Sequence, residues 1–467
     1  MASLQLGVTP RDGLCAAAFG ALGAAAFPPL GLWPLSIASV CLLLVLLKGR
    51  PIRESRNLGL VYGFANALGT MYWLFSIFSY GAIALIAIMA AYWGLLATLV
   101  SLVRGYRSLA AAALVALFAV GVEWLRGDAW YLRFPWYTIP HALAAAPFCI
   151  ASVRWLGCYG LSYLIWLIAA WGAFRSPLIW LAFALLPAAW LFLPATGSPD
   201  RQALLLQAED SSRFARLIED ASTQPVDVCV LPEYAYYFAP ERVLDDRRGP
   251  AALARKTRAV VVFGAVEGNL LQGPFQNVAA VIGGDGRLMG TFPKQRPLPL
   301  FKDGTPGKHR PVFPAQDGVL GVGICYDFDA PAIAASLVRN GATVFVDPTF
   351  DSIDWGRVQH EHHELLLRLR AVENDRWILR AASSGRSEAI DPRGVPSTAG
   401  VAIGETGAST VPFAHRTGVT LGGQASLMGP AAAAGTVLFV ALAFLSSRRA
   451  RPGKPAPQTI QSAREVP

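Results

Sequence analysis

Long uninterrupted apolar runs occur within the first 195 residues and again near the C-terminus, whereas residues 200–425 alternate short apolar runs with polar stretches. A membrane-spanning helix needs roughly 20 consecutive apolar residues. The runs therefore predict eight transmembrane helices, at 13–27, 31–47, 57–80, 81–103, 108–125, 160–174, 176–195 and 427–446. We expect the first to be retained rather than removed as a signal peptide, because further apolar segments follow it.

The block between the last two predicted spans has the pattern of a folded α/β domain. Apolar runs predict strands at 203–207, 227–231, 260–266, 277–282, 287–291, 318–324, 342–346 and 377–382. Amphipathic stretches predict helices at 213–221, 251–258, 330–339 and 359–374. Alternating strands and helices favour an α/β sandwich with mixed sheets. The predicted domains are a membrane domain at 1–198, an extracytoplasmic domain at 199–425, and a C-terminal helix with a cytoplasmic tail at 426–467.

The positive charge lies beside the predicted spans. Only 15% of the residues are charged, against about 25% in an average soluble domain. Basic clusters follow the second, fourth, sixth and eighth spans: Arg50, Arg53 and Arg56; Arg104 and Arg107; Arg175; and Arg448, Arg449, Arg451 and Lys454. Basic loops stay in the cytoplasm. The loop 126–158 and the block 200–425 are therefore expected outside, and the net charge of +9 does not indicate nucleic-acid binding.

Three residues that could support acyl transfer each follow an apolar run in the polar block: Glu233, Lys294 and Cys325. Active sites of α/β folds form at the carboxyl ends of strands. A thiol, a carboxylate and an ammonium group supply a nucleophile, a proton shuttle and an oxyanion partner. Taken singly, the cysteine favours a core residue and the other two favour solvated side chains. Their joint occurrence in one domain predicts a catalytic site.

The surroundings of the two cysteines in this block predict different roles. Cys325 follows Gly-Val-Gly-Ile, which suits a tight turn that exposes sulfur, and we expect a nearby cation to favour its thiolate. Cys229 lies inside an apolar strand and is expected to be buried and inert.

The sequence predicts no metal site and no cofactor. None of the six cysteines forms a CxxC pair. The segment His360-Glu-His-His-Glu364 places two candidate ligands four residues apart, but its spacing is not that of HExxH.

Aromatic residues surround the candidate glutamate. Tyr234, Tyr237 and Phe238 follow Glu233 closely, and they indicate either core packing or an amphipathic lip that admits acyl chains. The Pro- and Gly-rich segment 297–313 is expected to be a mobile lid, and Trp355 to line the same opening.

The polar block resembles the carbon–nitrogen hydrolase (nitrilase) superfamily. The resemblance rests on Leu231-Pro-Glu233, Pro293-Lys294 and Gly323-Ile-Cys-Tyr-Asp327, in that order, and on the later segments 344–351, 368–374 and 389–394. It implies a nitrilase-like αββα sandwich whose catalytic residues are Glu233, Lys294 and Cys325. It also implies that Tyr326 and Asp327, beside the nucleophile, contribute to substrate binding.

The membrane portion narrows the resemblance to apolipoprotein N-acyltransferases. Met71-Tyr-Trp73, Glu123-Trp-Leu-Arg126, Phe134-Pro-Trp136 and Gly157–Ser162 are similar to segments of that family, and the likeness covers roughly residues 10–446. It implies a multi-pass protein of the bacterial inner membrane with a periplasmic hydrolase domain. The implied donor is a phospholipid, and the acceptor is the α-amine of the S-diacylglyceryl cysteine that begins a lipoprotein.

Two departures from the family pattern leave alternatives open. The family places a second glutamate eight residues after its lysine, where this chain has Lys302 followed by Asp303. Either Asp303 substitutes for it after a one-residue slip, or the charge is reversed. The family's Gln-Gly-Asn is replaced by Gln207-Ala-Glu209. A membrane-tethered amidase and a catalytically impaired binding homologue are therefore alternative functions.

Overall fold

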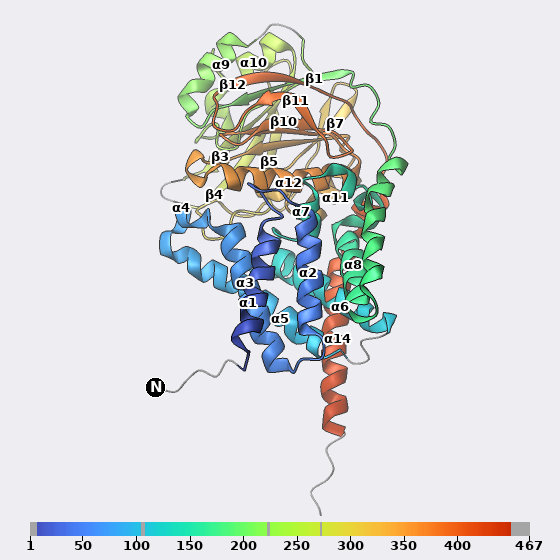
Figure 1. The fold of residues 1–467 in the computed structure, drawn as a ribbon. Helices are drawn as coiled ribbons and strands as arrows, with labels where there is room; N and C mark the ends of the chain where they lie inside the picture. The colour runs from blue at the N-terminus through green and yellow to red at the C-terminus, as the bar shows by residue number, and fades with distance from the viewer. Residues whose placement is uncertain (1–6, 104–107, 222–224, 271–272, 450–467) are drawn as a thin grey trace, which may run out of the picture.

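The computed structural model describes residues 7–103, 108–221, 225–270 and 273–449. A helical half and a β-sandwich half are stacked on one another (Figure 1). The basic cluster at Arg104 and Arg107, and the predicted tail after Arg449, lie outside the described residues.

Apolar helices form the first half of the chain, and one more helix joins them from its end. They are α1 (Pro10–Ala24), α2 (Pro34–Leu47), α3 (Ile52–Met71), α4 (Leu74–Phe78), α5 (Ala82–Ser101), α6 (Leu109–Trp124), α7 (Ile139–Leu143), α8 (Val153–Phe174) and α14 (Met428–Arg449). Shorter turns are η1 (Ser79–Gly81), the π-helical η2 (Leu125–Ala129) and η3 (Pro147–Cys149). The predicted span at 176–195 is the 3-10 helix η4 (Pro177–Phe192).

Four helical segments among the described residues are long and apolar enough to cross a membrane: Leu74–Ser101, Leu109–Ala129, Val153–Phe174 and Leu421–Ser446. Pro34–Leu47 and Pro177–Phe192 are shorter apolar helices. The predicted span at 57–80 is divided, because α3 begins at Ile52 and ends at Met71. Charged residues in the first turns of α3 hid its true start from the hydrophobic pattern. The total of eight spans stays a prediction.

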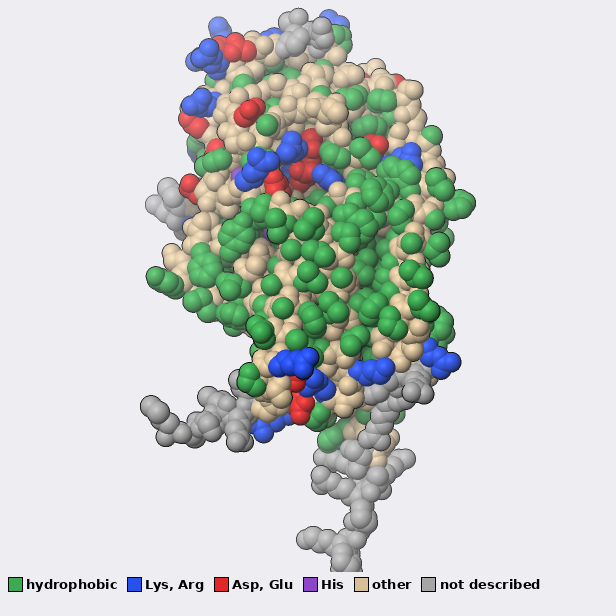
Figure 2. Space-filling view, in the orientation of Figure 1, with side chains coloured by type: hydrophobic (Ala, Val, Ile, Leu, Met, Phe, Trp, Pro, Cys, Tyr) green, Lys and Arg blue, Asp and Glu red, His purple; other side chains and the backbone are tan. Residues whose placement is uncertain are grey.

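Hydrophobic side chains cover the helical half in a broad band (Figure 2). Lys and Arg side chains gather at the end of this band that lies away from the sandwich. This arrangement agrees with basic residues flanking one side of a membrane.

Two six-stranded sheets form the other half, with strand orders β12-β1-β2-β3-β4-β5 and β11-β10-β9-β8-β7-β6. The first contains β1 (Arg201–Gln207), β2 (Val228–Val230), β3 (Val260–Gly268), β4 (Phe275–Ile282), β5 (Leu288–Pro293) and β12 (Gly407–Phe413). The second contains β6 (Phe313–Ala315), β7 (Gly318–Val322), β8 (Val344–Thr349), β9 (Ile378–Ala382), β10 (Ser387–Ile390) and β11 (Pro396–Val401). The neighbours β1, β2 and β3 are parallel, as are β7, β8 and β9, whereas the outer pairs are antiparallel.

Helices cover the outer face of each sheet, which completes an αββα sandwich (Figure 1). They are α9 (Phe214–Asp220) and α10 (Pro250–Thr257) on the first sheet, and α11 (Pro331–Arg339) and α12 (Arg357–Asn374) on the second, with α13 (Leu421–Gln424) leading into α14. The short turns are η5 (Ser211–Arg213), η6 (Pro240–Val243), η7 (Cys325–Asp327), η8 (Ile353–Trp355) and η9 (Ala425–Leu427).

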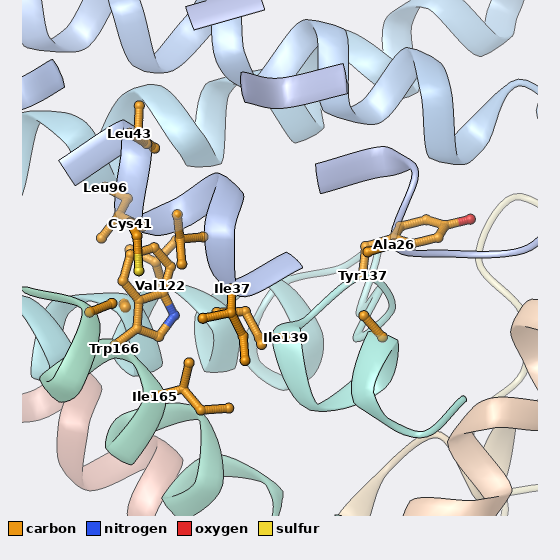
Figure 3. Close-up of a cluster of buried hydrophobic side chains, with 14 of the residues drawn as sticks. Ala26, Ile37, Cys41, Leu43, Leu96, Val122, Tyr137, Ile139, Ile165 and Trp166 are labelled. Atoms are coloured by element: carbon orange, nitrogen blue, oxygen red, sulfur yellow. The ribbon is translucent and has the colours of Figure 1, made fainter. Parts of the chain in front are cut away.

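Separate hydrophobic cores hold the two halves, and α12 joins them. One core lies between the sheets and another between the first sheet and α9 and α10. The core of the helical half includes Ile37, Trp166 and Tyr137 (Figure 3), and it continues into Leu365 and Leu369 of α12. Because one continuous core contains residues of both halves, the sandwich is fixed to the membrane helices by buried apolar surface.

Candidate active site

Glu233, Lys294 and Cys325 follow strands of the two facing sheets. Glu233 follows β2 and Lys294 follows β5 in the first sheet, while Cys325 follows β7 in the second and opens η7. Their exposed fractions are 3%, 1% and 2%. Cys325 has φ of 51°, in the left-handed region that non-glycine residues rarely adopt. The tight turn expected at this cysteine is therefore present, but the residue is buried, and the expected exposure of its sulfur is not seen.

The ammonium group of Lys294 lies between two carboxylates. Its Nζ is 2.7 Å from Glu233 Oε1 and 2.7 Å from Asp303 Oδ2. Asn277 on β4 donates to the same pair, at 2.6 Å to Glu233 Oε1 and 2.9 Å to Asp303 Oδ1. The two acids, the lysine and the amide therefore form one closed buried network.

Asp303 occupies the position beside the lysine, and Lys302 does not. Asp303 also accepts hydrogen bonds from Tyr234 Oη at 2.8 Å and from the backbone N–H of Leu298 at 2.7 Å. The exposed side chain of Lys302 instead donates to the carbonyl of Leu270. The structure therefore agrees with a one-residue slip, in which Asp303 takes the position beside Lys294. The charged group of Lys302 points away from Lys294.

Burial and the carboxylates set the protonation of this network. Burial opposes the charge on Lys294, but Asp303 and Glu233 outweigh it and hold its pKa well above the ordinary value. Burial raises the pKa of Glu233, and Lys294 offsets only part of that rise. Burial also opposes ionisation of Asp303, yet Lys294 brings its pKa below the ordinary value. Of the two acids beside Lys294, Asp303 therefore has a lowered pKa and Glu233 a raised one.

The thiol of Cys325 is expected to be protonated at rest. Burial and the charge of Glu233 raise its pKa well above the ordinary value, and Lys294 does not compensate. The expected nearby cation is present and favours the thiolate, because the charge of Lys294 lowers the pKa of Cys325, but burial and Glu233 outweigh it. Deprotonation must accompany attack, which requires a base nearby.

The backbone of Phe350 contacts both the base and the nucleophile. Its N–H donates to Glu233 Oε2 at 2.9 Å, and its carbonyl lies 4.0 Å from Cys325 Sγ. The turn that carries Cys325 is fixed by two buried acids. Asp347 accepts the backbone N–H of Cys325 at 3.0 Å, and Asp327 accepts N–H groups from Ile324 and Arg296 at 3.0 and 2.7 Å.

An apolar cavity of about 890 Å³, including its open mouth, extends from Cys325 into the helical half. Its walls contain side chains from α3, α4 and α5, such as Met71, Ile77 and Met89, and from the loop Leu298–Phe301. A chain of aromatic contacts, Phe78–Phe301 at 5.5 Å and Phe301–Trp355 at 5.8 Å, joins α4 to the sandwich beside it. The reactive sulfur thus faces a space built in part by membrane helices.

Only some of the predicted substrate-binding residues line the cavity. Tyr326 and Trp355 line the cavity. Tyr234 reaches the network through Asp303, and Tyr237 stacks on Tyr234 at 5.7 Å. Phe238 is about half exposed and is not among the cavity residues, and Asp327 binds backbone N–H groups instead of facing the cavity.

The histidines of α12 make protein contacts. His360 bonds the carbonyl of Ser352, and His362 bonds Tyr137 and the carbonyl of Pro28. His363 bonds Asp351. These contacts place the histidines in the packing between α12, the helical half and the site.

Several residues of the site gave little or no signal in the sequence. Asn277 and its neighbour Gln276 are the two amides of an otherwise apolar strand, which is the one pattern that could have indicated Asn277. Phe350 acts through its backbone, so its side chain carries no signal. Glu209 accepts hydrogen bonds from Ser352 Oγ and Ile353 N–H at 2.8 and 2.9 Å and thereby fixes the turn that carries Trp355.

Family models match both halves of the chain. The N-terminal domain of apolipoprotein N-acyltransferase matches residues 19–171, and carbon-nitrogen hydrolase matches residues 201–431. Curated apolipoprotein N-acyltransferases from Geobacter metallireducens and Azotobacter vinelandii are 27% and 28% identical to it. Each alignment covers 82% of this chain, and 86% and 85% of the relative.

A solved amidase from Nesterenkonia sp. is 20% identical and has a TM-score of 0.38, over 46% of this chain and 91% of its own. The two domain matches, in this order, together with relatives that align along most of the chain, show that it belongs to the apolipoprotein N-acyltransferase family.

Proposed function

We propose that the chain transfers a fatty acyl group from a phospholipid to the α-amine of the S-diacylglyceryl cysteine at a lipoprotein N-terminus. One observation supports this choice of substrate above the others. The buried Cys325 faces an apolar cavity whose walls include membrane helices, so an acyl chain reaches the sulfur from the bilayer. Curated relatives along 82% of the chain carry the name of this activity.

The first half-reaction forms a thioester. Glu233 takes the proton of Cys325 as sulfur attacks the ester carbonyl carbon. The charge that develops on the carbonyl oxygen is balanced by Lys294 and by the backbone N–H of Tyr326, the residue after Cys325 in η7. The C–S bond forms, the C–O bond to glycerol breaks, and Glu233 returns the proton to the departing lysophospholipid oxygen.

The second half-reaction uses the same groups in reverse. The free amine attacks the thioester carbon, a C–N bond forms and the C–S bond breaks. Glu233 accepts the amine proton and passes it to the Cys325 sulfur. Asp303 holds Lys294 in place through both steps, so that Glu233 is left to move protons.

The proposed topology follows from the one-sided basic residues and the site. Residues 1–198 form the membrane domain and 426–467 the last span with a cytoplasmic tail. Residues 199–425 form the periplasmic hydrolase domain, with its active site at the outer surface of the bacterial inner membrane. This placement brings the site beside the outer-leaflet lipids and beside the exported lipoprotein.

The product distinguishes transferase from amidase. The purified chain is incubated with phosphatidylethanolamine and a peptide whose N-terminal cysteine carries S-diacylglycerol, and products are resolved by mass spectrometry. N-acylated peptide supports the proposal. Free fatty acid as the main product supports a membrane-tethered amidase, and the absence of both supports an impaired binding homologue.

A further inference from the structure

Arg126 is a buried cation that no described carboxylate approaches within the 4.0 Å of an ion pair. It follows α6 in the π-helical turn η2 and is 6% exposed. Its Nε has no hydrogen-bond acceptor, and its Nη1 contacts only the thioether sulfur of Met89 at 3.9 Å. A buried guanidinium is costly unless a negative group meets it. Among the described residues, the Arg126 guanidinium therefore has no anion at hydrogen-bonding distance.

The other buried arginines in the described part of the chain all have acceptors. Arg296 pairs with Asp128, Arg370 with Glu373 and Arg380 with Asp351, whereas Arg376 donates to backbone carbonyls. Glu123, one turn before Arg126, accepts hydrogen bonds from Ser162 at 2.6 Å and Trp166 at 3.4 Å. Within the described part of the chain, no ion pair of 4.0 Å or less joins Glu123 to Arg126. Among these buried arginines, Arg126 is therefore the one that forms no ion pair or hydrogen bond to oxygen in the described part of the chain.

Arg126 lines the cavity that contains Cys325. It also lines a second cavity of about 600 Å³ inside the helical bundle, and Arg126 and Tyr92 are common to both. Two backbone hydrogen bonds fix the turn around it, from Trp130 N–H to the carbonyl of Leu125 and from Phe134 N–H to the carbonyl of Arg126, each 3.0 Å. The guanidinium is therefore held at the wall of the acyl cavity by a rigid backbone.

We propose that Arg126 binds the phosphodiester of the donor phospholipid and so sets the position of its ester carbonyl against Cys325. A phospholipid donor combines apolar acyl chains with a negatively charged phosphodiester. The cavity likewise combines mostly apolar walls with the guanidinium of Arg126. Guanidinium groups bind phosphate oxygens through two parallel N–H donors. Helix α6 ends two residues before Arg126, and Arg296 of the sandwich donates to the carbonyl of the next residue, Gly127, at 2.7 Å. Arg126 therefore lies at the end of the membrane domain that faces the hydrolase, where lipid headgroups lie. The inference rests on the proposed function, because it assumes a phospholipid donor.

The test compares two acyl donors on the full-length protein in detergent. Acylation of Cys325 is followed by intact mass with dioleoylphosphatidylethanolamine, and separately with p-nitrophenyl palmitate, which has no phosphate. Arg126→Gln is expected to lower kcat/KM for the phospholipid on the order of 10- to 100-fold, the usual cost of a lost hydrogen bond to a charged group. The p-nitrophenyl ester is expected to react at the wild-type rate, and Arg126→Lys to restore part of the phospholipid rate.

Matched variants and competing ions separate the alternatives. Arg133→Gln, at an exposed arginine of the same loop, is expected to react normally with both donors. An equal loss with both donors in Arg126→Gln, or no loss with either, would overturn the phosphodiester assignment. So would protection of wild-type Cys325 by excess inorganic phosphate, which would show an ion site independent of lipid. A wild-type protein that reacts with p-nitrophenyl palmitate but not with phospholipid would refute the proposed donor itself.

Discussion

Removing the Asp303 carboxylate should slow acyl transfer far more than changing its charged neighbour Lys302. Asp303 is buried and accepts from Lys294, Asn277, Tyr234 and the backbone of Leu298, over distances of 2.7 to 2.9 Å. In Asp303→Ala, Glu233 is the remaining carboxylate against Lys294, and a stronger ion pair makes Glu233 a weaker base. Loss of general-base function typically costs about 10²–10⁴ in rate.

Removing the Asp303 carboxylate should also lower the free energy of unfolding. Breaking a buried ion pair by removing one partner costs about 3–5 kcal/mol. Asp303→Ala should therefore lower the thermal unfolding temperature, whereas Asp303→Asn keeps the shape and isolates the loss of charge. Lys302→Glu alters an exposed side chain and should change stability by no more than about 0.5 kcal/mol.

The assay measures thioester on Cys325 by intact mass and N-acylated peptide by chromatography, in folded protein at a temperature below each variant's unfolding. We expect Asp303→Asn to slow both half-reactions and Lys302→Glu to affect neither. If Lys302→Glu changes transfer while Asp303→Asn does not, the charge at position 302 is the functional one and Asp303 does not have the role given to it here.

Three further predictions concern the nucleophile, the topology and pH. Cys229→Ala should form the thioester normally, because Cys229 is buried inside β2. Cys325→Ala should form no thioester in mass measurements. Loss of the thioester in folded Cys229→Ala would show that the nucleophile is misassigned. Reporter fusions at residue 200 and after Arg451 should report opposite sides of the membrane, and the same side for both would rule out eight spans. Burial raises the pKa of Glu233 above its ordinary value near 4.3. The ionised fraction of Glu233, which can act as base, therefore falls as the pH decreases through this raised pKa. The rate of thioester formation should fall with it in the wild type, and a pH-independent rate would contradict the role of Glu233.

The sequence predicted the triad because each of its members follows a buried strand, and strand ends can be located from hydrophobic runs. It could not decide between Lys302 and Asp303, because that choice depends on how the loop after β5 turns back to donate the Leu298 N–H to Asp303. It also missed β6, β10, β11 and β12. These strands are short or partly polar, and pairing with neighbouring strands stabilises them more than their own pattern does.

The cavity and Arg126 could not be predicted for a different reason. Arg126 lies in a segment that the sequence marked as similar to the family, but its lack of a partner depends on where Glu123 and Met89 point after the helices pack. The resting state of the Cys325 thiol likewise depends on the balance of Lys294 against two carboxylates in space. These interactions depend on how the side chains are arranged in space, which the spacing of residues along the sequence does not indicate.

In the proposed mechanism, Cys325 carries an acyl group taken from phospholipid. The most direct test is the intact mass of the purified chain after mixing with a phospholipid of defined acyl composition, without an amine acceptor. We expect a mass increase equal to one acyl group, mapped to Cys325 and removed by hydroxylamine or by the acceptor peptide. An unmodified mass for a folded protein, or an adduct on another residue, would contradict it.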